Sequence, residues 1–173
     1  MRGPRLPCHR FAATLRTAAG IAALLLATAA HAGADCSVAA GGVGFGVYDP
    51  TIATADDAVG TFTVVCVYVP PGGATSVAYS LQLSPGSSGT YTQRQLVTGV
   101  SRLSYNLYLD AARTQVLGSG VGGTWDIRNS ITVGPGVGNG TRTNTYSIYG
   151  RMPALQDALV GSYSDTIVAT LTF

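Results

Sequence analysis

The sequence contains no lysine and no glutamate, and its two histidines, His9 and His31, both lie in the first 31 residues. The usual bases that activate a nucleophile are therefore missing from the rest of the chain, so common nucleophile–base pairs have no base there. A metal site that needs histidine to complete its ligand set is disfavoured for the same reason. We therefore expect no enzyme activity, no cofactor and no metal.

Long hydrophobic runs are also scarce. The main one, "AAGIAALLLATAA", covers residues 18–30 and follows four arginines. It is too short to cross a bilayer, which takes about 20 residues. A basic start, a short apolar run and small-residue A-x-A sites are typical of a cleaved export signal. We predict a signal peptide over residues 1–34, with cleavage after Ala34 preferred to cleavage after Ala32, and one exported domain over 35–173 that does not insert into a membrane.

Charge is sparse in residues 35–173, where six arginines and eight aspartates give a net charge of −2. The formal charge of +2 on the full chain therefore comes from the predicted signal. Residues 35–173 lack the basic patch that binds nucleic acid or anionic lipid. We expect no nucleic-acid partner.

Cysteine is equally rare, because Cys8 lies in the predicted signal and only Cys36 and Cys66 remain in the domain. An even pair in an oxidising compartment predicts a disulfide. Such a bridge closes a loop of about 30 residues, for which the chain-entropy model gives about 3–4 kcal/mol. The alternatives are two unpaired buried thiols or a two-cysteine metal site.

Alternation of apolar and polar residues is the periodic signal that the domain does show. It predicts β-strands, and glycine- and proline-rich turns separate several of them. The one short stretch that could form a helical turn is 153–159. The strands are expected at 61–69, 76–84, 102–110, 143–152 and 161–173, and the turns at 70–73, 84–89, 118–123 and 134–140. This pattern predicts an all-β, immunoglobulin-like antiparallel β-sandwich.

Acidic residues supply the few candidates for chemistry. The adjacent Asp56 and Asp57 could hold a hard cation, although a solvated loop is the simpler interpretation. Asp157 and Asp165 could form a glycosidase pair, although Asp165 begins a strand and is better explained as a residue that caps a turn.

Aromatic residues supply candidates for binding. Nine tyrosines and one tryptophan could form a platform for sugars or surfaces, and we single out Tyr91 and Trp125 among five aromatics expected to be exposed. A tyrosine on a strand usually packs half-buried with its hydroxyl in water, so a structural role is the alternative. The other three are Tyr48, Tyr108 and Tyr149.

Three segments, "FGVYDP" (45–50), "LSYNLYLDAART" (103–114) and "YGRMPALQDALVGSYSDTIVATLTF" (149–173), resemble the spore coat protein U domain family. This is the module of archaic, Csu-type chaperone–usher pilins. The resemblance implies an incomplete immunoglobulin-like sandwich of about six to seven strands that lacks its last strand. It also implies a subunit that passes through the periplasm to a fimbrium at the cell surface, with a periplasmic chaperone, an outer-membrane usher and other pilin subunits as partners.

The resemblance further implies donor-strand complementation along the C-terminal strand, where the chain ends abruptly on an apolar row. A bare strand edge would aggregate, so a chaperone strand fills it first and a neighbouring subunit's strand replaces it. The alternative is an ordinary last strand in a complete sandwich. The expected contact residues are Ile167, Ala169, Leu171 and Phe173.

Two departures from the family pattern refine these expectations. At most three residues, 33–35, lie between the predicted cut and Cys36, and they span only about 10 Å. The chain could thus accept a donor strand but hardly supply one, which predicts a tip-side or accessory subunit. The stretch 116–124 also replaces the family's Trp-Gly-Asp-Gly-Thr run, so no role is carried over to it. The alternative functions are a self-sufficient carbohydrate- or surface-binding module and a coat protein of resting cells.

Overall fold

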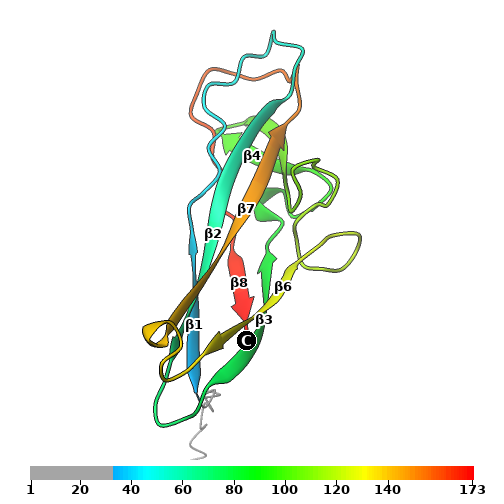
Figure 1. The fold of residues 1–173 in the computed structure, drawn as a ribbon. Helices are drawn as coiled ribbons and strands as arrows, with labels where there is room; N and C mark the ends of the chain where they lie inside the picture. The colour runs from blue at the N-terminus through cyan, green and yellow to red at the C-terminus, as the bar shows by residue number, and fades with distance from the viewer. Residues whose placement is uncertain (1–32) are drawn as a thin grey trace, which may run out of the picture. The chain divides into compact units, whose positions relative to one another are not determined.

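Eight β-strands form two antiparallel sheets in the computed structural model, which describes residues 33–173 (Figure 1). The first sheet has the order β1-β2-β7-β5-β4 and the second β6-β3-β8. The predicted signal peptide lies outside the described residues, apart from its last two positions. The strands are β1 (Ala34–Ala40), β2 (Asp56–Tyr68), β3 (Thr75–Leu83), β4 (Arg94–Thr98), β5 (Ser101–Tyr108), β6 (Ile127–Val133), β7 (Thr141–Met152) and β8 (Ala169–Thr172), with short 3₁₀ turns η1 (Gly86–Ser88) and η2 (Gly138–Gly140).

The predicted all-β sandwich is confirmed, and so are four of its strands, which correspond to β2, β3, β5 and β7. Eight strands are present where six to seven were expected. The stretch 153–159, which could have formed a helical turn, does not form one: the segment is irregular, and Leu155 has a left-handed φ of 56°. The predicted strand 161–173 is also too long, because regular pairing is confined to 169–172.

Inward-facing residues of both sheets form one core that includes Phe62 and Val64 on β2, Leu81 on β3 and Ile148 on β7. Alternate positions along each strand point to the same face, so the apolar rows read from the sequence meet between the sheets. The disulfide prediction is confirmed: Cys36 and Cys66 are bonded, lie directly opposite each other on β1 and β2, and are both buried.

Two glycines on the inner face make room for the chain that follows β1. A side chain at Gly150 would place its Cβ 2.7 Å from the ring of Phe45, and one at Gly60 would meet the backbone of Gly42. Segment 42–45 therefore crosses β2 and β7 at these two points. Phe45 packs edge-on against Tyr105, with ring centroids 5.8 Å apart. The segment thereby becomes one wall of the groove described next.

Candidate strand-accepting groove

The C-terminal strand β8 lies at one edge of its sheet. Within residues 33–173 it pairs only with β3, with Leu171 opposite Leu81 and Ala169 opposite Leu83. The predicted alternation is present from Tyr163 onward, since every second residue is half-buried and the residues between them are exposed. The inward row packs against the core but reaches only partial burial.

The backbone hydrogen bonds of β8 run toward β3, on one side of the strand. Ser84 N–H donates to the carbonyl of Val168 (2.9 Å), so Ser84 and Val168 form a hydrogen-bonded pair of the antiparallel ladder. Bonded pairs recur at every second residue of an antiparallel ladder, so Thr170 bonds to β3 as well. The N–H and C=O groups of Ala169 and Leu171 therefore point toward the outer edge of β8.

A groove of about 320 Å³ opens between segments 40–45 and 165–167. Its walls include Val43 and Phe45 on one side and Ile167 on the other, and its floor is formed largely by apolar core residues. No backbone hydrogen bond joins the two walls within the described part of the chain. The floor includes Phe62, Leu107 and Ile148. The groove therefore has the form of a slot between two segments that are not paired with each other.

Asp165 fixes one wall of this slot. Its carboxylate accepts hydrogen bonds from Ser87 N–H (2.9 Å), Thr166 N–H (2.8 Å) and the hydroxyl of Tyr105 (2.7 Å). Burial, together with this bond to Asp165, raises the pKa of Tyr105, so the phenol stays protonated as the donor. Asp157 is exposed, and none of the hydrogen bonds of Asp165 in the described residues involves it. The structure thus gives Asp165 a local structural role and does not assemble the glycosidase pair.

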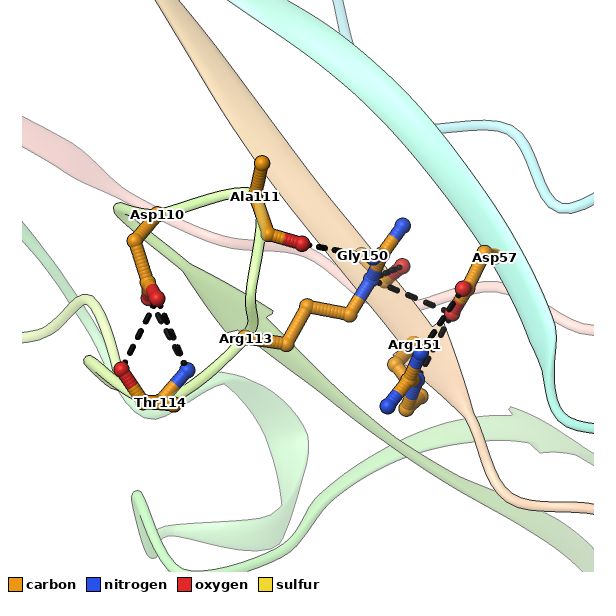
Figure 2. A network of polar contacts seen from close by, with 7 residues as sticks. All are labelled: Asp57, Asp110, Ala111, Arg113, Thr114, Gly150 and Arg151. Carbon is orange, nitrogen blue, oxygen red and sulfur yellow. Dashed lines mark hydrogen bonds and ion pairs between the residues drawn. The ribbon is translucent and has the colours of Figure 1, made fainter.

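The aspartate pair 56–57 lies on strand β2 and not in the solvated loop that was expected. Figure 2 shows Asp57 with the arginines that surround it. The Asp57 carboxylate accepts two hydrogen bonds from Arg151, both 2.8 Å. It also forms an ion pair with Arg113, at an N–O distance of 3.1 Å. The hydrogen bonds from Arg151 lower the pKa of Asp57, whereas burial raises the pKa of Asp56. Two guanidinium groups therefore occupy the carboxylate that a cation would need. No cluster of three or more metal-ligating side chains occurs among residues 33–173.

The aromatic candidates have different environments. Tyr91 is half-buried, and its hydroxyl donates to the Leu83 carbonyl (2.9 Å). Tyr48 is tied by its hydroxyl to Pro153 and Gln156, and Tyr149 lies beneath the Arg113 guanidinium. Trp125 is 52% exposed. Only Trp125 among the five aromatics is as exposed as the sequence suggested.

Arg94 is the main residue that sequence reasoning missed. Its side chain is fully buried beside Tyr91 and donates to Asn106 Oδ1 (2.7 Å) and to the carbonyls of Leu117 (2.8 Å) and Ser84 (3.0 Å). Burial lowers the pKa of Arg94. The polar run "TYTQRQ" around Arg94 is typical of a surface loop, so the sequence contains no signal that Arg94 is buried.

Comparisons with known proteins agree with this architecture. Protein U of Myxococcus xanthus is 30% identical over 155 residues, which cover 83% of this chain and 80% of that protein. A solved complex of chaperone and tip adhesion subunit, CsuC–CsuE from the archaic chaperone–usher Csu pili of Acinetobacter baumannii, has a similar fold with a TM-score of 0.50 at 20% identity. The match covers 81% of this chain and 40% of the solved chain, so this chain spans less than half the length of that one.

The matching family model is described as a spore coat protein domain and the solved match as a pilus tip adhesion subunit, and neither description names an enzyme activity. Disulfides persist outside the reducing cytoplasm, and the bond between Cys36 and Cys66 agrees with a family of extracellular or surface proteins. Within residues 33–173, no helix has the length and apolar character to span a bilayer. The family model of the spore coat protein U domain matches residues 21–170, and the chain therefore belongs to the Spore Coat Protein U domain family.

Proposed function

We propose that this protein is a secreted structural and adhesive subunit of an archaic chaperone–usher pilus, and that it accepts a donor strand along β8. The proposal rests on the edge position of β8 and on the half-buried apolar row that runs from Ile167 into β8, of which Ile167 lines the groove. An exposed strand edge presents unpaired backbone N–H and C=O groups, which can form hydrogen bonds with another strand. The partners are a periplasmic chaperone, an outer-membrane usher and neighbouring subunits.

The energy available from such a strand is large. Residues 165–173 extend over about 30 Å at ~3.3 Å per residue, so a donor of similar length can follow them. Full burial of four medium apolar side chains is worth roughly 6–10 kcal/mol gross. The contact residues on this chain would be Ile167, Ala169, Leu171 and Phe173.

The N-terminal end supports a tip-side or accessory position. Gly33 accepts a hydrogen bond from Val69 N–H (3.1 Å), and Ala34 and Asp35 pair with Tyr68 and Val67 of β2. A chain cut after Ala32 or Ala34 would therefore keep few residues before Cys36, and those residues belong to its own sheet. Ala34 is buried in that sheet, and on this ground we propose cleavage after Ala32 in place of the site preferred from sequence.

Exposed aliphatic side chains at one end of the sandwich support an adhesive role. The loops 41–55 and 153–162 lie together there (Figure 1), joined by hydrogen bonds of the Tyr48 hydroxyl with Pro153 and Gln156. Val47 is 97% exposed, Leu159 is 63% exposed and Val160 is fully exposed. Clustered apolar surface of this kind marks interaction sites, and here it would contact apolar surfaces.

Replacing Val47, Leu159 and Val160 together by serine is expected to reduce retention of the protein on polystyrene at least a few-fold, because each valine or leucine loses apolar contact area. The measurement is the amount of purified protein retained after washing. The control variant replaces Val59 and Val67, exposed valines of β2, by serine. Equal retention of the two variants would count against adhesion through the loops.

Amide exchange tests the donor-strand proposal itself. In the monomeric chain, the amides of Ala169 and Leu171 are expected to exchange fast, whereas that of Thr170 is protected by β3, because only Thr170 bonds inward. Residue-resolved NMR on the monomer and on its chaperone complex measures this difference, and protection of Ala169 and Leu171 should appear in the complex. Protection of both amides in the lone monomer would mean that the edge is already covered, and the proposal would fail.

A resting-cell coat protein is the second candidate, favoured by the 30% identity to Protein U and by the family's description as spore coat proteins. The two functions differ in when the protein is made and in what exports it. Surface display during vegetative growth that disappears on deletion of a chaperone or usher gene supports the pilus. Production confined to resting cells supports the coat.

A further inference from the structure

A second groove, separate from β8, lies beside the one tryptophan of the sequence. It has a volume of about 760 Å³, within the range of roughly 300–1,000 Å³ that is usual for small-molecule sites. Residues from the loop before β6, from β6 and from β7 form it. Its lining includes Leu109, Trp125, Asp126, Ile127, Arg128 and Tyr146.

The backbone around Trp125 is held firmly. Its N–H donates to the Val116 carbonyl (2.8 Å), and its carbonyl accepts from Gly118 N–H (2.7 Å). The hydroxyl of Thr124 accepts hydrogen bonds from Ser119 N–H (3.1 Å) and Gly120 N–H (3.2 Å). The indole thus projects from a braced loop while remaining 52% exposed. The loop that carries the indole is therefore held in place before a ligand binds, which lowers the cost of ordering it on binding.

A polar pair lies next to the indole in sequence. The side chain of Asp126 is only 9% exposed, and both its oxygens accept from Arg128 Nε, at 3.1 and 3.0 Å. The Arg128 side chain is 73% exposed, and within the described residues its two terminal amino groups have no protein partner. Glycine at position 120 allows the close approach, because a Cβ there would lie 2.7 Å from the Asp126 carboxyl carbon.

We propose that this groove binds a neutral saccharide. A pyranose has an apolar C–H face that can pack on the Trp125 indole, an amphipathic ring suited to such contacts. Its hydroxyl groups can accept hydrogen bonds from the terminal N–H groups of Arg128. Because Asp126 offsets the charge of Arg128, the site favours a neutral hydroxylated ligand over a phosphate or sulfate. This proposal does not depend on the donor strand, because no β8 residue lines the groove.

Trp125 provides its own reporter, because it is the one tryptophan of the chain. The purified protein is titrated with cellobiose, lactose, chitobiose and mannobiose, each up to about 10 mM, and tryptophan emission is recorded. At least one saccharide is expected to give a saturable change. Arg128→Gln should weaken that binding about tenfold, the loss of about 1.4 kcal/mol from a hydrogen bond to a charged group. Arg142→Gln, at an exposed arginine outside the groove, is the control and should bind as the parent protein does.

Three results would overturn the proposal. The first is the absence of any saturable change with all four saccharides. The second is equal binding by the Arg128→Gln and Arg142→Gln variants, which would place the sugar elsewhere. The third is a stronger response to sodium phosphate than to any saccharide, which would make the site an anion site. None of these results bears on strand acceptance at β8, so the two proposals fail separately.

Discussion

Replacing Leu171 by aspartate is expected to lower recovery of the protein in a chaperone complex at least tenfold. Leu171 points inward from β8, packs against the core and is only half-buried, so a donor strand would complete its burial. The change removes about 1.5–3 kcal/mol of apolar burial and places a charge between the strands, where desolvation costs several kcal/mol more. Each 1.4 kcal/mol lowers affinity about tenfold. The measurement is co-purification from the periplasm with a co-expressed immunoglobulin-like chaperone of the chaperone–usher type.

The matched control is Thr170→Asp, one residue away on the same strand. Thr170 is exposed on the outer face, so a carboxylate there remains in water and the complex should form normally. Circular dichroism of both variants after refolding separates a lost partner from a lost fold, since Leu171 also lies opposite Leu81. If Leu171→Asp, folded, is recovered with the chaperone as well as Thr170→Asp, the partner does not use the inward row of β8.

The strands that could be predicted from the sequence are those in which apolar and polar residues alternate without interruption. The stretches "SVAYSLQLS" and "RLSYNLYLD" became β3 and β5 because apolar residues at every second position can be buried only on one face of a strand. The strand β4 was missed because its first residue is an arginine. The strand β6 was missed because Asn129 interrupts its apolar row.

The walls of the groove were harder to predict for a physical reason. Segment 161–168 alternates as a strand does, yet Ser164 bonds to Val97 of β4 before the chain reaches β3. A chain that passes from one sheet to the other cannot keep one regular ladder. The opposite wall depends on Gly60 and Gly150, whose role is visible only once segment 42–45 lies across them. The contact residues on β8 followed from alternation and family resemblance, whereas the shape of the slot depends on these tertiary contacts.

The buried guanidinium of Arg94 leads to the largest expected loss of stability. It connects β4 to β5 through Asn106, and to the chain after β3 and the loop before β6 through the carbonyls of Ser84 and Leu117. Arg94→Met keeps much of the apolar stem but leaves the carbonyls of Ser84 and Leu117 without a donor, whereas Asn106 Oδ1 loses one donor and keeps Leu107 N–H. Each unsatisfied buried polar group costs about 1–3 kcal/mol, so we expect a decrease of roughly 3–5 kcal/mol in the free energy of unfolding, measured by urea denaturation.

Arg102→Met is the matched control, because Arg102 is exposed on β5 and its loss should change stability by less than about 0.5 kcal/mol. Arg94→Lys should recover only part of the loss, since a single ammonium cannot reproduce the planar fork that reaches Asn106 and two carbonyls. No salt bridge to Arg94 occurs in the described residues, so its contribution must come from these hydrogen bonds and from the Tyr91 ring, 5.2 Å away. An Arg94→Met protein as stable as Arg102→Met would mean that water or a rearranged loop satisfies the carbonyls of Ser84 and Leu117, and the cluster would not be what connects these segments.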